Sequence, residues 1–472
     1  MTDALQYQKQ KELFGHPVGL YILFFTEMWE RFSYYGMRAI LVLYLVAEAT
    51  SGNPGLGWTD AKALSLYGTY TMLVYVASIP GGWIADKFLG QKQSVMVGGI
   101  LLVAGHGILS VEEMWAFYTG LGLIIAGVGM LKPNISTMVG GLYKPGDIRR
   151  DKGFTIFYIG INVGAFLSSL IVGYVGEVYG WHYGFGLAAI GMALGLIQYV
   201  AGQKHLKYVG NNTNKSIDPE EKAAMKRPLT KVEKDRVIVL FVSFLLVIVF
   251  WGAFEQAGGL MNIYAMDKTN RSLLGWEVPA SWFQSLNAMF IIIFGTIVAG
   301  YWAKRKLKGK ISTSLFKMCV GLIIMGMGFF FMTAAAAQYN IQGSSAMYWL
   351  VLAYLFHTIG ELCLSPVALS YITKLAPLKY ASLMMGVYFA MTGLGNKVAG
   401  LLGESASNLG EYTVFTGIAV FCVTFGLLVL LVRKKLEKLT HGAEDNEREI
   451  DDHDSVDNEP YELADPDINK AN

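Results

Sequence analysis

Residues 237–260 read VIVLFVSFLLVIVFWGAFEQAGGL, and Glu255 is the one ionisable side chain in this run. A helix of this length spans the hydrocarbon core of a bilayer. Backbone groups inside that core have no water to bond with, so the run is predicted to be a helix. This stretch therefore indicates an integral membrane protein.

Eleven further apolar runs of similar length occur along the chain. Of its 472 residues 53% are hydrophobic and only 16% are charged, and the mean hydropathy is +0.41. A soluble domain carries about 25% charged residues, so this composition favours lipid as the solvent. We predict an all-α membrane protein with twelve transmembrane helices, at 19–47, 63–85, 93–110, 114–140, 154–177, 182–203, 237–260, 282–303, 314–336, 346–373, 381–403 and 412–432.

The basic residues of the loops predict the orientation of the chain. The loops after odd-numbered spans hold few of them, among them Lys62, Lys268 and Arg271. Basic loops stay in the cytoplasm, so both termini are expected to be cytoplasmic and the protein to be a multi-pass protein of the cell inner membrane. The loops after even-numbered spans include Lys144, Arg149, Arg150, Lys152, Lys204, Lys207, Lys304, Arg305, Lys306, Lys308 and Lys310.

A polar stretch at 204–236 separates the first six predicted spans from the last six. We expect an N-terminal six-helix half at 1–203 and a C-terminal six-helix half at 237–433. The stretch between them is interpreted as a cytoplasmic linker, too short and polar to hold an extra helix pair. The acidic segment 434–472 is expected to be a disordered cytoplasmic tail. Two such halves predict a site between them near mid-membrane.

Charged side chains are rare within the predicted spans. Such a charge costs ~2.5–3.5 kcal/mol at a helix centre, so each one is expected to face protein or water and to mark a functional site. The alternative is a set of structural ion pairs that hold helices together. The residues concerned are Glu27, Glu30, Arg31, Arg38, Lys132, Glu255, Glu361 and Lys397.

The densest group of charges lies in the first span. Glu27, Glu30, Arg31 and Tyr34 are spaced three or four residues apart and share one helix face. With both carboxylates ionised, Arg31 is held by acids. Protonation of one acid frees the guanidinium to take another carboxylate, so the group predicts a titratable switch.

The charges also divide between the halves. The first half contributes Arg31 and Lys132, and the second contributes Glu255 and Glu361. A cavity between them would be positive on one wall and negative on the other, which suits a short zwitterion such as a peptide. We find no phosphate-binding loop, metal-ligand cluster or Ser-His-Asp pattern, so we expect no enzyme, no metal and no cofactor other than the coupling protons.

Asn162 and Asn287 are amides within apolar segments. Each is expected either to bind a ligand's backbone or to join two helices. His357 stands four residues before Glu361, so the two side chains can touch across one helical turn.

Seven short blocks, spread in order over the first eleven spans, form a specific set. They are EMWERFSYY at 27–35, GWIADKFLG at 82–90, GMLKPN at 129–134, FYIGINVG at 157–164, FWGAFEQAG at 250–258, SWFQSLN at 281–287 and GELCLSP at 360–366. Together they resemble the proton-dependent oligopeptide transporter (POT/PTR) family of the major facilitator superfamily. The resemblance implies a major facilitator fold and a symporter that imports di- and tripeptides with protons by alternating access. Its expected partners are peptides, protons and the lipid bilayer, with no nucleic acid and no obligate protein partner.

The resemblance also implies roles for single residues. Arg31 and Lys132 match residues that contact the peptide carboxylate, and Glu361 matches the residue that contacts the amine. The other substrate-binding positions are Tyr34, Tyr35, Tyr75, Asn162, Asn287 and Tyr388.

Proton coupling is assigned by the same resemblance to Glu27, Glu30, Arg31 and Glu255. Arg38 and Glu255 match a gating salt bridge, which inward opening is expected to break as proton and peptide are released. Asp86 and Lys87 match a cytoplasmic clamp of the outward-facing state.

The sequence departs from the family pattern in one place that bears on coupling. Animal relatives carry a histidine where this chain has Gly68, so coupling is expected to rest on the carboxylates. The alternative function is a carrier of nitrate or another small metabolite in the same family. Retention of Glu361 argues against an anion carrier, which needs no acidic amine site.

Overall fold

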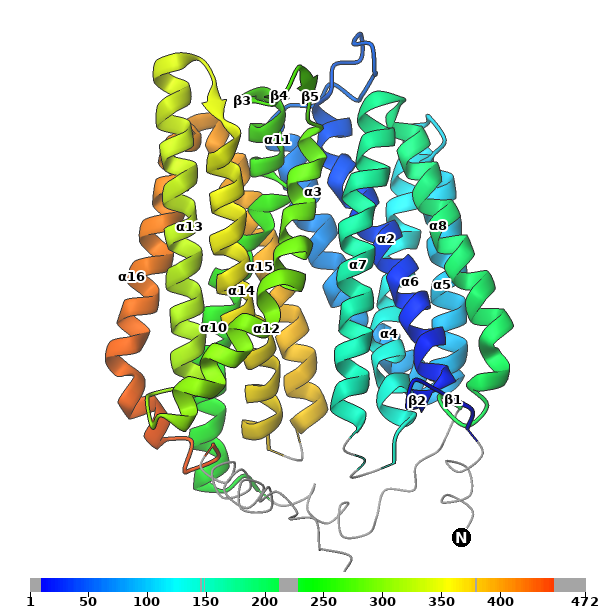
Figure 1. Cartoon of the computed structure of the whole chain (residues 1–472), viewed down its shortest axis with the longest axis vertical. Coiled ribbons are helices and arrows are strands. Elements are labelled where there is room, and N and C mark those ends of the chain that lie inside the picture. Colours follow the sequence, from blue (N-terminus) through cyan, green and yellow to red (C-terminus); the bar gives the residue numbers. More distant parts are fainter. Residues whose placement is uncertain (1–9, 145–146, 148, 212–227, 378–379, 445–472) are drawn as a thin grey trace, which may run out of the picture.

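The computed structural model describes residues 10–144, 147, 149–211, 228–377 and 380–444. Figure 1 shows long, nearly parallel helices in two groups, which we call the N-bundle (α2–α8) and the C-bundle (α10–α16). The helices are α2 (Val18–Val46), α3 (Asp60–Val76), α4 (Ser78–Ile84), α5 (Gln91–Leu109), α6 (Met114–Gly141), α7 (Arg149–Val178), α8 (Trp181–Ala201), α10 (Lys231–Phe254), α11 (Leu260–Asp267), α12 (Ser285–Leu307), α13 (Ser314–Gln342), α14 (Met347–Leu375), α15 (Ala381–Leu409) and α16 (Glu411–Lys438).

Short elements connect or flank these helices. η1 (Ala85–Leu89) is a π-helical turn, and η2 (Gly202–His205), η3 (Glu255–Ala257) and η4 (Ala280–Gln284) are 3₁₀ turns. The described residues form three two-stranded ladders: β1 (Glu12–Leu13) pairs antiparallel with β2 (His16–Pro17), β3 (Thr269–Asn270) parallel with β6 (Ser345–Ala346), and β4 (Ser272–Leu273) antiparallel with β5 (Trp276–Glu277).

Each predicted span falls on a helix of the described chain. Nine helical segments of the described residues are long and apolar enough to cross a membrane. The other three predicted spans lie on α2, α3 and α15. α2 carries Glu27, Glu30, Arg31 and Arg38, and α3 has only 17 residues. The number of twelve crossings therefore stays a prediction.

Two predicted spans are interrupted, and the breaks have local causes. The span 63–85 divides at Ala77 into α3 and α4, close to Pro80, which has no N–H to donate. The span 237–260 ends as an α-helix at Phe254, and Gly258–Gly259 then separate η3 from α11. This second break leaves Glu255 at the C-terminal end of α10 rather than inside it.

Glycines allow α3 of the N-bundle and α15 of the C-bundle to pack closely. A Cβ atom on Gly68 would lie 2.7 Å from the Cα of Gly400. Next to this contact, Lys397 Nζ donates to Thr69 Oγ1 at 2.8 Å. Lys397 thus joins two helices, as the structural alternative for intramembrane charges supposed.

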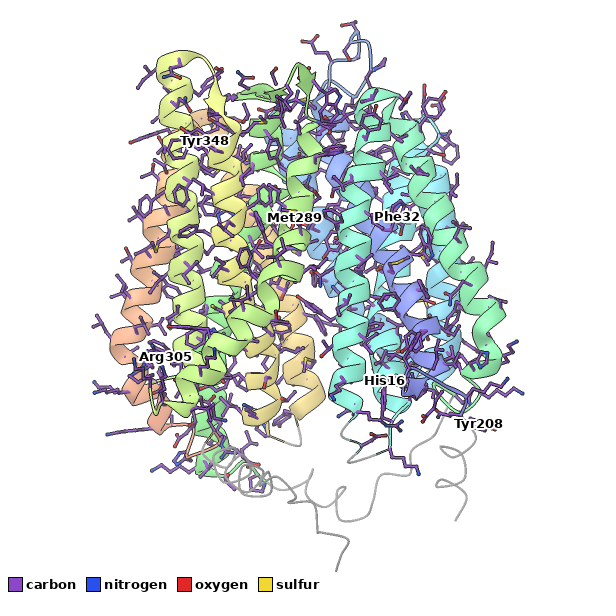
Figure 2. The ribbon with its side chains drawn as sticks, viewed as in Figure 1. His16, Phe32, Tyr208, Met289, Arg305 and Tyr348 are labelled. Carbon is purple, nitrogen blue, oxygen red and sulfur yellow. The ribbon has the colours of Figure 1, made fainter. Side chains whose placement is uncertain are left out.

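The two ends of the bundles differ in charge. Figure 2 places Arg305, His16 and Tyr208 at the lower end and Tyr348 at the upper end. Lys304, Arg305 and Lys306 lie in the last turn of α12, so we call the lower end the basic end and the other the opposite end. β1 and the last turn of α16 also lie at the basic end (Figure 1).

The predicted domain limits are tested only in part, because residues 212–227 of the linker and 445–472 of the tail lie outside the described residues. α10 begins at Lys231, inside the predicted linker, and α16 ends at Lys438, inside the predicted tail.

We expect Gly68→Ala to lower the midpoint of thermal unfolding in detergent. The added methyl meets backbone atoms that cannot rotate away, and overpacking of this kind costs roughly 1–3 kcal/mol. The matched control is Gly122→Ala in α6, where a Cβ meets nothing within 4 Å. Equal midpoints for the two variants would show that α3 and α15 do not need this contact.

Candidate functional site

The charged face of α2 forms as its spacing predicted. Arg31 Nε lies 3.1 Å from Glu27 Oε1 and also pairs with Glu30. All three side chains are buried. The guanidinium lies over the rings of Tyr34 and Tyr35, 5.6 and 5.7 Å from their centroids.

Glu27 and Glu30 do not satisfy all of the hydrogen-bond donors of Arg31. Its Nη2 is buried and has no hydrogen-bond partner among the described residues. A buried donor without a partner is costly, so this atom is suited to a ligand oxygen. Glu27 Oε2 is likewise buried without a partner there, and it can accept a proton or a donor.

Lys132 joins this group from α6. Pro133 follows it inside the helix and cannot donate to the carbonyl of Gly129. The α4 helix packs against that carbonyl through Gly81. Lys132 Nζ lies 4.1 Å from the centroid of the Tyr75 ring and within electrostatic range of Arg31. Lys132 and Arg31 thus lie near each other in the N-bundle.

Glu361 is held on the C-bundle side. Asn287 Nδ2 of α12 donates to Glu361 Oε2 at 2.8 Å and approaches Thr358 Oγ1 at 3.1 Å. Asn287 therefore joins α12 to α14, as one of its two predicted roles required. It does so beside a half-buried carboxylate, so the other predicted role, contact with a ligand's backbone, stays a prediction. Tyr388 lies within electrostatic range of Glu361.

Asn162 and His357 behave differently from Asn287. Asn162 Nδ2 donates to the carbonyl of Tyr158 in its own helix, 2.9 Å away, so this bond joins no second helix. His357 packs on Phe329 of α13, with ring centroids 4.4 Å apart, and neither ring nitrogen has a partner among the described residues. The described contacts of His357 thus lead to α13, whereas Glu361 bonds to α12.

Figure 2 labels one residue near each group. Phe32 of α2, next to Arg31, and Met289 of α12, two residues after Asn287, are drawn at similar heights in the N-bundle and the C-bundle.

The predicted salt bridge between Arg38 and Glu255 is formed, and its gating role stays a prediction. Arg38 Nη1 lies 3.0 Å from both oxygens of Glu255, and all of these groups are buried. Tyr67 of α3 donates to Glu255 Oε2 at 2.9 Å, and the Arg38 guanidinium lies 4.8 Å from the centroid of the Tyr35 ring. Glu255 thus ties the C-bundle to two helices of the N-bundle.

Amide side chains add to this junction. Asn262 Nδ2 and Gln284 Nε2 of the C-bundle both donate to the carbonyl of Ala39 in α2, at 2.8 and 3.3 Å. Ala39 directly follows Arg38, so these bonds and the salt bridge form one seam on the side of Arg31 that faces the opposite end.

Asp86 and Lys87 lie far from this seam, exposed on η1 at the basic end. Lys87 Nζ lies 5.0 Å from the centroid of the Trp83 ring. Their role as a cytoplasmic clamp stays a prediction.

Sequence reasoning missed three contributors to the site. Thr358 lies one turn from Glu361, and Tyr158 lies within the block at 157–164, so helical spacing offered a signal for both. Tyr67 offered none, because a tyrosine in an apolar helix is common.

Comparisons with known proteins identify the family of this chain. A family model described as the POT family matches residues 92–225 and 218–414. The uncharacterized transporter YclF of Bacillus subtilis (strain 168) is 37% identical, over 92% of this chain and 97% of that protein. A di-/tripeptide transporter of Lactococcus lactis subsp. cremoris is 34% identical, over 91% of this chain and 98% of that protein.

Solved structures match as well. A POT family transporter in complex with a thioalcohol-conjugated peptide superposes with a TM-score of 0.84 at 31% identity, over 92% of this chain and 100% of that chain. The fold and the matches define a membrane transporter and not an enzyme. The chain belongs to the POT family, and the resemblance found in its sequence is confirmed.

A double-mutant cycle at the seam tests whether Arg38 and Glu255 act as a pair. Arg38→Met or Glu255→Met alone leaves a buried charge unpaired, which costs roughly 3–5 kcal/mol. We expect the double variant to unfold at a higher temperature than the sum of the two single losses predicts. Tyr67→Phe serves as the control and should cost less, because the ion pair remains. Additive losses would mean that the two charges are not coupled.

Proposed function

We propose that this chain is a proton-coupled symporter that imports di- and tripeptides by alternating access. The observation that carries the proposal is the division of charge between the bundles. Arg31 and Lys132 are held on the N-bundle, and Glu361 is held on the C-bundle by Asn287. Relatives described as di-/tripeptide transporters and a peptide-bound POT structure support the same substrate class.

The substrate is held at both of its ends. Its carboxylate takes the open Nη2 of Arg31, in the bidentate geometry that guanidinium favours, and the ammonium of Lys132. Its amine pairs with Glu361. Tyr34, Tyr35, Tyr75 and Tyr388 provide ring faces and hydroxyls, and Asn162 and Asn287 are assigned to the peptide backbone.

Proton coupling follows from the two acids around Arg31. With both ionised, Arg31 is held on α2, as in this structure. Protonation of Glu27 or Glu30 weakens that hold and releases the guanidinium to the substrate carboxylate. One proton moving down 100 mV supplies ~2.3 kcal/mol. At ~1.4 kcal/mol per tenfold, this sustains roughly 50-fold accumulation.

We propose an order of gating that differs from the order expected from the sequence, in which inward opening broke Arg38–Glu255. Arg38–Glu255 is formed here together with the amide bonds to Ala39, toward the opposite end. If the basic end is cytoplasmic, this seam closes the outer side. We therefore propose that outward opening, and not inward opening, breaks Arg38–Glu255. Peptide and proton then leave toward the cytoplasm while the seam is intact.

The same proposal includes the membrane topology of the chain. The chain crosses the inner membrane of the cell twelve times in two six-helix halves, 1–203 and 237–433, and both termini lie in the cytoplasm. The position of β1 and the end of α16 at the basic end supports it, because basic loops are retained in the cytoplasm. Asp86 and Lys87 at that end would clamp the outward-facing state.

The test is uptake of labelled dialanine into proteoliposomes with and without an inward proton gradient. We expect accumulation that a protonophore abolishes and that excess unlabelled tripeptide competes away. Glu361→Gln should reduce uptake at least tenfold, because the amide still accepts from Asn287 but no longer pairs with an amine. Glu48→Gln, at an exposed acid at the end of α2, is the control. Uptake that survives Glu361→Gln favours an anion or metabolite carrier.

Coupling is tested separately with Glu27→Gln. The amide mimics a permanently protonated acid, so we expect loss of gradient-driven accumulation with retention of dialanine exchange across the same vesicles. A variant that still accumulates dialanine in response to the gradient would remove Glu27 from the coupling mechanism.

A further inference from the structure

The C-terminal end of α7 makes a further contact between the bundles, beside the Arg38–Glu255 seam and through a different helix of the N-bundle. Glu177, in the last turn of α7, accepts hydrogen bonds from the backbone N–H groups of Ala280 (2.9 Å) and Ser281 (2.8 Å) in η4. The Glu177 side chain of the N-bundle thus binds the first residues of a 3₁₀ turn in the C-bundle.

The two donors have a reason to bind a carboxylate. The first N–H groups of a helical turn have no partner within the turn, and Pro279 before them provides no capping side chain. An anion at such a position is bound by aligned N–H dipoles. In the closed arrangement the carboxylate and both N–H groups satisfy one another, and in an open arrangement water would replace them.

The same face of α7 completes the contact. Trp282 Nε1 donates to the carbonyl of Leu170 at 3.0 Å, and Gly173 packs on Ser281, where a side chain on α7 would leave no room. Leu170, Gly173 and Glu177 are spaced three and four residues apart, so they form one stripe.

The base of this stripe is anchored within the N-bundle. Asn53 Nδ2 donates to the carbonyls of Gly176 (2.8 Å) and Glu177 (3.2 Å), and Asn53 Oδ1 accepts from the backbone N–H of Trp181. The end of α7 is therefore fixed to its own bundle, and its bonds to η4 are the part that can separate as the bundles move.

We propose that Glu177 is a gating residue of the transport cycle, a latch that holds the end opposite the basic end closed through the N–H groups of Ala280 and Ser281. The latch uses a different helix of the N-bundle from the charge pair Arg38–Glu255, and it holds the first residues of η4, whose last residue, Gln284, bonds to Ala39 in the seam. The inference rests on the proposed alternating-access cycle but not on the substrate.

The test measures the distance between spin labels at Trp115→Cys in α6 and Tyr348→Cys in α14, both exposed in the first turn of their helices. The native Cys319, Cys363 and Cys422, all buried, are replaced by alanine. Glu177→Gln keeps the size but replaces one of the two accepting oxygens with an NH2 group, which cannot accept from an N–H. Glu177→Asp keeps the charge but withdraws it by one methylene. We expect both to shift the closed-to-open equilibrium roughly tenfold toward longer distances, the value of a hydrogen bond to an ionised group. Glu48→Gln, exposed on the same bundle, is the matched control.

Thermal unfolding of each variant is measured alongside, so that a folding defect is recognised. Distance distributions that stay as in the parent in folded variants, or that shift toward shorter distances, overturn the latch. A parent chain that fails to take up dialanine overturns the proposed substrate instead, while the distance measurement still decides the latch.

Discussion

A charged side chain inside a bilayer is costly unless it is paired or hydrated, and this constraint organises the centre of the protein. Arg31 is surrounded by Glu27 and Glu30, and Arg38 is bonded to Glu255 and through it to Tyr67. These groups differ in one respect. Arg38 binds an acid of the other bundle, so its ion pair depends on the relative position of the two bundles. Arg31 binds acids of its own helix, so its pairing can change without moving a helix, as the proposed substrate and proton site requires.

The junction between the bundles is built mostly from hydrogen bonds to backbone groups. Asn262, Gln284 and Glu177 all bond to main-chain atoms of the facing bundle, and one ion pair accompanies them. The N–H groups of Ala280 and Ser281 are available because the first residues of a helical turn have no partner within it. The carbonyl of Ala39 lies inside α2 and accepts from the facing bundle because a carbonyl oxygen has a second lone pair. Bonds of this kind are individually modest in water. In the proposed alternating-access cycle this junction opens in every turn, and several weak contacts separate more readily than one strong contact.

Glycine gives the helices their close approach. At Gly68–Gly400 the backbones of α3 and α15 touch, and at Gly81 the backbone of α4 packs on the carbonyl left free by Pro133. In lipid, such packing replaces the hydrophobic effect as the force that joins helices. It also positions polar groups, because Lys132 stands directly before Pro133. The contact of Gly81 with the helix turn before Pro133 thus provides close packing at the same place where Lys132 is positioned.

The sequence by itself determined the membrane class, the position of each helical run, the charged face of α2 and the family, because these depend on hydrophobic length, helical period and short motifs. Only the tertiary structure decided that Glu255 ends α10, that Tyr67 completes its bonding and that Glu177 meets η4. The reason is that these contacts join residues 103 to 217 positions apart, or involve backbone N–H and C=O groups that every residue carries. A pattern of side chains in the sequence cannot predict these contacts. They exist only once the helices are packed.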